Sequence, residues 1–106
     1  MIYFDNSATT YPKPQNVIYA VNKAMNNYSF NSGRGGYKES VDTSNMIFNT
    51  REKVADLFNF EPQNIAFTQN CTVALNFAIK GLAKQGDHFI ISNLEHNAVA
   101  RPIYML

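Results

Sequence analysis

The sequence is short of cysteine, of excess charge and of long apolar runs. Cys71 is the one cysteine among 106 residues, so no disulfide can form within the chain, which is typical of a protein from a reducing compartment. Cys71, His88 and His96 lack the spacing of a zinc site, and we therefore expect no structural metal.

The charges nearly balance. The formal net charge is +1 and charged residues make up 16% of the chain, which argues against nucleic acid or another polyanion as a partner. No apolar run approaches the roughly 20 residues needed to cross a bilayer, and the N-terminus lacks the basic and apolar regions of a signal peptide. With 45% hydrophobic residues the length suits one small domain, and we expect a cytoplasmic protein.

Residues 1–13 are expected to form an arm. Pro12 and Pro14 prevent a regular helix or strand until the chain has passed them. A helix is predicted to begin near Pro14, because the apolar residues that follow recur on one helical face. These residues are Val17, Ile18, Val21, Ala24, Met25 and Tyr28.

A glycine-rich loop over residues 31–36 follows this helix. Its glycines beside Arg34 could cradle an anion, but no strand precedes the loop as the dinucleotide-binding motif requires, and we favour a flexible connector. A second helix is predicted from Tyr37 to Phe58, with a buried apolar stripe and a solvated charged face. The stripe consists of Ile47, Phe48, Val54, Ala55 and Phe58.

The most informative stretch is IAFTQNCTVALNFAIKG, residues 65–81. Residues 65–67 resemble a short buried strand, residues 68–70 a polar turn, and the chain from Thr72 a helix. The first amides of such a helix have no intrahelical acceptor and the helix dipole adds positive charge, so the turn is a socket for an anion such as phosphate. Thr72 would add a hydroxyl donor, and Cys71 is small enough to let a ligand approach. A turn that binds nothing, with Thr72 as an ordinary cap, is the alternative.

A second strand is predicted at residues 88–92, which completes a strand, helix, strand pattern typical of a parallel α/β sheet. Ligands of such sheets bind at the carboxyl ends of the strands. Two polar stretches follow the predicted strands, residues 68–72 and 93–97, and the second contains His96. Their convergence favours a shared site, although a histidine alone is more often simply exposed or hydrogen-bonded.

Four segments in this order resemble a known family. YFDNSATTYPKP, NSGRGGY, IAFTQNCTVALN and ISNLEHNAVARP are similar to the N-terminal part of class V aminotransferases, and within them to the cysteine desulfurase branch. The resemblance covers essentially the whole chain. It implies pyridoxal 5′-phosphate as cofactor and the α/β type I transferase fold, a three-layer αβα arrangement with a mostly parallel sheet, here incomplete. It also implies a homodimer, with the large domain beginning at residue 14.

The resemblance assigns roles residue by residue. Cys71 and Thr72 fall where the family holds the cofactor phosphate, and His96 falls where a histidine stacks on the pyridine ring and assists proton transfer. Asn6 and Ala8 fall in a segment that lines the substrate pocket. The implied reaction releases sulfur from cysteine and leaves alanine, with a sulfur-acceptor protein as a further partner. Amino-group transfer and selenocysteine cleavage are alternatives on the same fold, and a non-catalytic phosphate-binding or interaction module is an alternative of another class.

The chain departs from the family in one turn and lacks several of its residues. The phosphate turn usually carries Gly-Ala-Thr or Gly-Thr-Thr, whereas this chain has Asn70, Cys71 and Thr72. The family's Schiff-base lysine, pyridine-nitrogen aspartate and nucleophilic cysteine would all lie beyond Leu106. We therefore expect an N-terminal fragment that is inactive alone, with the partners of both predicted strands outside it.

Overall fold

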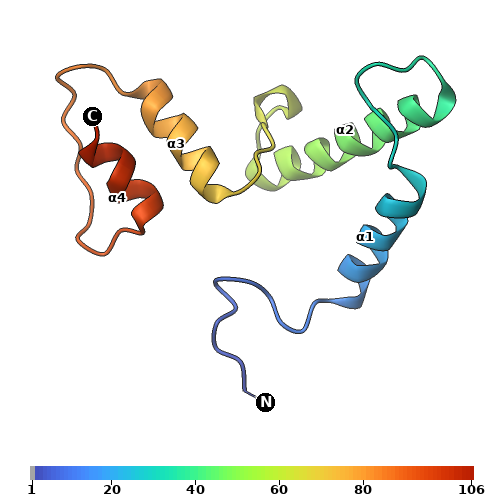
Figure 1. Cartoon of the computed structure of the whole chain (residues 1–106), viewed down its shortest axis with the longest axis horizontal. Helices are drawn as coiled ribbons and strands as arrows, with labels where there is room; N and C mark the ends of the chain where they lie inside the picture. The colour runs from blue at the N-terminus through green and yellow to red at the C-terminus, as the bar shows by residue number, and fades with distance from the viewer. Residues whose placement is uncertain (1) are drawn as a thin grey trace. The chain divides into compact units, whose positions relative to one another are not determined.

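The computed structural model describes residues 2–106, and the regular structure in that range is helical (Figure 1). Along the chain lie α1 (Gln15–Asn27), α2 (Lys38–Phe58), the short 3-10 helix η1 (Pro62–Asn64), α3 (Cys71–Leu82) and α4 (Asn97–Tyr104).

The predicted fold class is wrong for this structure. No residue from 2 to 106 is in a β-strand, so the structure has no αβα layering and no parallel sheet. Residues 65–67 and 88–92, predicted as strands, are irregular. An apolar run becomes a strand only when its backbone N–H and C=O groups pair with a neighbouring segment, and these two segments form no ladder with each other. Side chains expected in a core are exposed accordingly, Phe67 by 51% and Ile90 by 90%.

The helix predictions are confirmed to within a residue or two. The second helix begins at Lys38 after Tyr37 and ends at Phe58, and α3 begins at Cys71, one residue before the predicted Thr72. Asn59 ends α2 in the left-handed conformation, with φ of 53°, which asparagine adopts more readily than most residues. Local spacing and cap chemistry are thus sufficient to define these helices.

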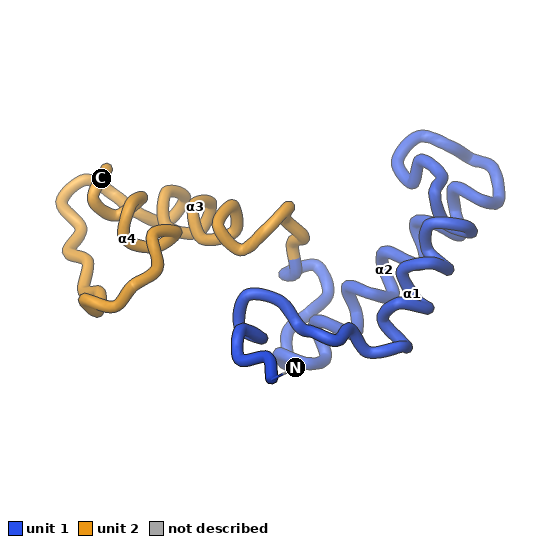
Figure 2. Tube along the Cα trace, turned by 60° about the horizontal axis from the view of Figure 1, so that its bottom comes forward, with its two compact units in different colours: residues 1–65 blue, residues 66–106 orange. Residues whose placement is uncertain are grey.

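The chain divides into two compact units, which we describe separately (Figure 2). In the first, which ends at Ile65, α2 packs against η1, and Ala55 is completely buried. The Arg51 guanidinium donates a hydrogen bond to the Ile65 carbonyl oxygen. In the second unit, Ala66–Leu106, α3 packs against α4.

The first residues of the glycine-rich loop, which we predicted to be a flexible connector, form hydrogen bonds with α2. The Ser40 hydroxyl donates to the Asn31 carbonyl oxygen at 2.7 Å, and the Ser44 hydroxyl donates to that of Ser32 at 2.7 Å. Gly35 approaches α2 so closely that an added Cβ would lie 2.9 Å from the Ser40 Cβ. Two serines one helical turn apart therefore hold the loop against the start of α2.

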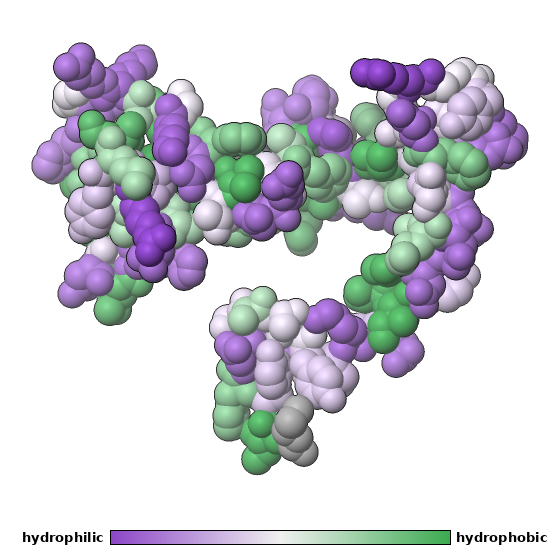
Figure 3. Space-filling model, in the orientation of Figure 1, coloured by the Kyte–Doolittle hydropathy of each residue, from purple (hydrophilic) through white to green (hydrophobic). Residues whose placement is uncertain are grey.

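Few apolar side chains are buried. Ala55 and Ala98 form the buried hydrophobic core of the described chain, while larger apolar residues such as Phe4 and Leu94 are exposed. Hydrophobic residues accordingly reach the surface beside hydrophilic ones (Figure 3). Apolar burial is the main favourable contribution to folding, and a small domain has a net stability of only about 5–15 kcal/mol. The burial in this chain is too small to support a strongly cooperative fold.

We predict that the 106-residue chain unfolds gradually in urea. The slope of its unfolding free energy against urea concentration should fall below the usual lower value of about 1 kcal/mol per molar, because that slope scales with the surface exposed on unfolding. Far-ultraviolet circular dichroism during a urea titration measures the slope, and a dye that fluoresces on apolar surface should bind without denaturant. A sharp transition with no dye binding would contradict the prediction.

Candidate functional site

The start of α3 is built by polar side chains. Asn70 precedes the helix in an extended conformation, and its side-chain oxygen accepts a hydrogen bond from the Val73 amide at 2.9 Å. The Thr68 hydroxyl donates to the Asn70 carbonyl oxygen at 3.0 Å, and the Ala74 amide donates to the same oxygen at 3.1 Å. The turn before α3 is therefore held by Thr68 and Asn70, whose side chains suit these bonds.

Two backbone N–H groups at the start of α3 have no acceptor within the helix and can donate to a ligand. Cys71 and Thr72 are the first two residues of α3, so their N–H groups have no carbonyl one turn earlier within the helix. Both residues are exposed. The helix dipole places about half a positive charge at this end. The Thr72 hydroxyl adds a side-chain donor beside the amides.

His96 is the residue before α4 and caps that helix. Its Nδ1 accepts a hydrogen bond from the Ala98 amide at 3.1 Å. A ring nitrogen that accepts a hydrogen bond carries no proton, so the neutral imidazole carries its proton on Nε2. The cap orients the ring and leaves Nε2 as the nitrogen that can exchange a proton with a ligand.

Thr72 and His96 line the same pocket. It has a volume of about 380 Å³ and lies between α3 and α4, which pack against each other. Thr72 and Asn76 are one turn apart on α3, and the pocket residues from Ala98 onward follow the three- and four-residue spacing of one helical face. The full lining consists of Thr72, Asn76, His96, Asn97, Ala98, Arg101, Pro102 and Met105.

The pocket favours an anion. Arg101 is its charged lining residue, and no aspartate or glutamate is among the described residues that line it. Glu95, the acid nearest in sequence to His96, accepts a hydrogen bond from the Ser92 hydroxyl at 2.9 Å and is not part of the lining. The hydrogen-bond donors at this site are backbone amides at the start of α3, the Thr72 hydroxyl and the Arg101 guanidinium. Groups of these kinds bind phosphate in proteins.

The other predicted site residues lie elsewhere or outside the lining. Cys71 adjoins Thr72 at the start of α3 but is not among the described residues that line the pocket. Asn6 and Ala8 belong to the first unit and line a different pocket, of about 470 Å³, together with Lys13. Their place in a substrate site stays a prediction.

Sequence reasoning missed two contributors. The predicted polar turn at residues 68–70 includes Asn70 without identifying it as a cap, although asparagine directly before a helical segment is a recognised cap signal. Arg101 was not considered, because its membership of the pocket follows only from the packing of α4 on α3. Spacing within α4 alone carries no signal for it.

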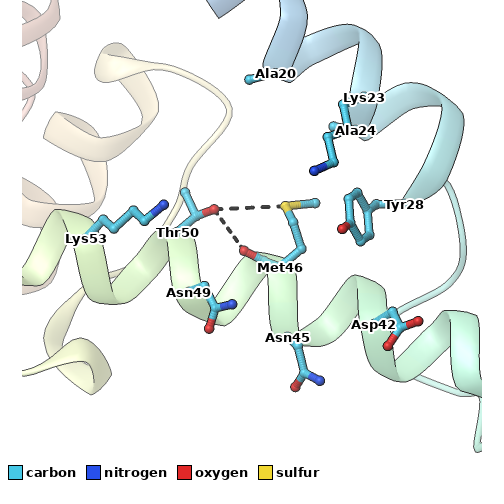
Figure 4. Close-up of a pocket in the computed structure, with 10 residues that line it drawn as sticks. All are labelled: Ala20, Lys23, Ala24, Tyr28, Asp42, Asn45, Met46, Asn49, Thr50 and Lys53. Carbon is cyan, nitrogen blue, oxygen red and sulfur yellow. Dashed lines mark hydrogen bonds between the residues drawn. The ribbon is translucent and has the colours of Figure 1, made fainter. Parts of the chain in front are cut away.

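The first unit has a larger groove, of about 680 Å³, between α1 and α2 (Figure 4). Lys23, Asp42 and Lys53 give it charges of both signs, and the Thr50 hydroxyl donates to the Met46 carbonyl oxygen at 2.8 Å. Asp42 also pairs with Lys38, and this hydrogen bond and charge attraction raise the pKa of Lys38. None of the predicted site residues lies in this groove.

Residues 2–106 contain no group of three or more histidine, cysteine or acidic side chains placed to hold a metal ion. None of the helices in the same range is long and apolar enough to cross a membrane.

Comparison with known proteins identifies the family. Residues 2–106 match the family model described as aminotransferase class-V. The chain belongs to the class V aminotransferase family. Enzymes of this family depend in general on pyridoxal 5′-phosphate. No solved structure matches the chain.

Relatives of this class V chain carry the name cysteine desulfurase. The chain is 39% identical to a probable cysteine desulfurase of Borreliella burgdorferi, over 96% of this chain and 25% of the relative. It is 34% identical to a probable cysteine desulfurase of Methanothermobacter thermautotrophicus, over 92% of this chain and 24% of the relative. It is 39% identical to cysteine desulfurase IscS of Vibrio atlanticus, over 99% and 27%. The chain thus spans about a quarter of the length of these relatives.

We predict that Asn70→Ala loosens the first turn of α3. The substitution removes the acceptor of the Val73 amide, and loss of such a cap costs about 1 kcal/mol, which corresponds to roughly fivefold faster amide exchange at Val73. Hydrogen exchange followed by nuclear magnetic resonance measures this rate. Asn70→Ser is the matched control, because serine caps about as well and should keep the exchange slow. Equal rates in Asn70→Ala and the unchanged chain would show that the cap contributes nothing.

Proposed function

We propose that the natural protein that carries this chain is a pyridoxal-phosphate-dependent cysteine desulfurase, which removes sulfur from cysteine and leaves alanine. The names of the relatives support the reaction. The observation that carries the proposal within the chain is the pocket that Thr72 and His96 share, because it pairs an anion-binding helix start with an imidazole.

The residues at the start of α3 fit the cofactor phosphate. Thr72, which lines the pocket beside the basic Arg101, would donate its hydroxyl. The amides of Thr72 and of Cys71, which precedes it at the start of α3 outside the lining, would donate alongside. When bound, pyridoxal 5′-phosphate supplies an electron sink for chemistry at the α-carbon of an amino acid. The phosphate contacts would hold it in place for that chemistry.

His96 is proposed to cover the cofactor ring and to move a proton. The hydrogen bond from the Ala98 amide to Nδ1 supports a fixed ring orientation, and it leaves Nε2 as the atom that gives up or takes a proton. A flat imidazole suits both tasks, because it can cover a ring and its nitrogen can accept or donate a proton.

The substrate pocket and the partners complete the proposal. Asn6 and Ala8 would line the substrate pocket, and the amino-acid substrate would be cysteine. A homodimer, a sulfur-acceptor protein and a cytoplasmic location fit the same family. Amino-group transfer is the second candidate, because the family model that matches the chain is described as an aminotransferase.

The proposed function is tested on the natural protein by two measurements. The purified protein should show the visible absorption band of bound cofactor. With cysteine and an added thiol reductant, which supplies the two electrons that convert the removed sulfur to sulfide, it should release sulfide and alanine in equal amounts. A protein that binds the cofactor but forms a keto acid from its amino-acid substrate would instead be an aminotransferase. Absence of the band after incubation with pyridoxal 5′-phosphate would refute both.

We predict that Thr72→Ala weakens cofactor binding in the natural protein. A hydrogen bond to a charged acceptor contributes about 1.5–3 kcal/mol, so the dissociation constant should rise roughly ten- to a hundredfold. Titration of the cofactor-free protein, followed by absorption, measures the constant. Thr72→Ser keeps the hydroxyl and should bind nearly as the unchanged protein does. A dissociation constant for Thr72→Ala equal to that of the unchanged protein would refute the phosphate assignment.

We predict that His96→Ala lowers turnover more than cofactor affinity. Proton transfer by a positioned side chain typically contributes about a hundred- to ten-thousandfold in rate, whereas the phosphate contacts remain in this variant. Initial rates of sulfide release in the presence of a thiol reductant give turnover, and the same absorption titration gives affinity. His96→Asn is the matched control, since its side-chain oxygen can still cap α4 while it cannot act as a base near neutral pH. If His96→Asn were as active as the unchanged protein, the proton-transfer role would be wrong.

A further inference from the structure

We propose that Arg101 pairs with the phosphate of the cofactor in the pocket between α3 and α4. This inference rests on the proposed function and extends it to a residue that none of the preceding assignments includes. It makes Arg101 the positive side chain of a phosphate site that otherwise consists of neutral donors.

Arg101 and the predicted phosphate-binding residue Thr72 line the same pocket. Arg101 lies on the face of α4 that also presents Ala98 and Pro102 to the pocket, three residues after the first and one before the second. On the opposite wall Thr72 and Asn76 lie one turn apart on α3. The packing of α3 against α4 therefore brings the arginine and the predicted phosphate-binding threonine into one cavity.

The charge of a phosphate exceeds what a helix start alone can balance. A phosphate ester carries close to two negative charges at neutral pH, whereas the start of a helix offers about half a positive charge. Arg101 is the charged residue of the lining, and no acid of the described chain lines the pocket to compete for it. A guanidinium also presents a planar fork of donors that matches two phosphate oxygens.

The Arg101 guanidinium is available to a ligand. Among residues 2–106 it forms neither a hydrogen bond nor an ion pair, and it is exposed. Arg51 differs in this respect, because it donates to the Ile65 carbonyl oxygen. An arginine without an internal partner, in a pocket without acids, has its whole donor set free for an anionic ligand.

The test compares three variants of the cofactor-free natural protein. Arg101→Gln removes the charge, Arg101→Lys keeps the charge without the fork, and Lys80→Gln removes a positive charge from α3 outside the pocket lining. Dissociation constants are measured for pyridoxal 5′-phosphate and for pyridoxal, which lacks the phosphate. We expect Arg101→Gln to weaken binding of the phosphate form about ten- to a hundredfold, Arg101→Lys to weaken it less, and Lys80→Gln to leave it unchanged. Affinity for pyridoxal should be the same in all four proteins.

The outcomes separate this inference from the proposed function. Equal affinities of the unchanged protein and Arg101→Gln for pyridoxal 5′-phosphate would overturn the role of Arg101 and leave the proposed function intact. A rise in KM for cysteine at unchanged cofactor affinity would likewise overturn it, in favour of contact with the substrate carboxylate. Failure of the unchanged protein to bind the cofactor would overturn both.

A second measurement tests the role of Arg101 in the unchanged protein, so it does not depend on whether a variant folds. Phenylglyoxal modifies accessible arginines, and mass spectrometry reports the extent at each one. In the unchanged, cofactor-free protein, pyridoxal 5′-phosphate should slow the modification of Arg101 at least severalfold while pyridoxal should not. Inorganic phosphate at high concentration should protect in the same way. Equal modification of Arg101 with and without pyridoxal 5′-phosphate would overturn the proposal.

Discussion

The candidate site depends on how two helices begin. The amides at the start of any helix need acceptors, and in α3 and α4 a side chain just before the helix provides one. Asn70 accepts from Val73, and His96 accepts from Ala98. The Asn70 cap satisfies the Val73 amide of α3 and leaves the amides of Cys71 and Thr72 able to donate to a ligand. The second cap uses Nδ1 of His96 and leaves Nε2. Each cap therefore stabilises a helix and also determines which donors the pocket presents.

Packing between α3 and α4 turns these two helix starts into one site. Thr72 and His96 are 24 positions apart in sequence, as their numbers show, and they meet because both helices contribute a face to the same pocket. The buried Ala98 and Pro102 lie on that face of α4 and allow the close approach. Thr72 and Arg101 thus reach one cavity from different helices. Local capping sets the chemistry of each wall, and helix packing sets their combination.

The helices could be predicted from the sequence because their causes are local. Pro14 before α1, the apolar spacing of α2 and the left-handed Asn59 at its end all act within a few residues. The strands could not be predicted in the same way. An apolar run such as 88–92 indicates burial, but a strand also requires a neighbouring segment with which its backbone can pair. Residues 88–92 have no such neighbour in this structure, and Ile90 is exposed. The sheet prediction therefore failed where it depended on contacts distant in sequence.

The same distinction explains which site residues were found. Thr72 and His96 were predicted from polar stretches that follow apolar runs, and that reasoning assumed a sheet to bring them together. They share a pocket although no sheet is present from residue 2 to residue 106, because α3 and α4 pack directly against each other. Arg101 was missed because only this packing connects it to Thr72. A prediction that begins from helix caps and then pairs neighbouring helices would reach the pocket without assuming a sheet, and it would include the arginine.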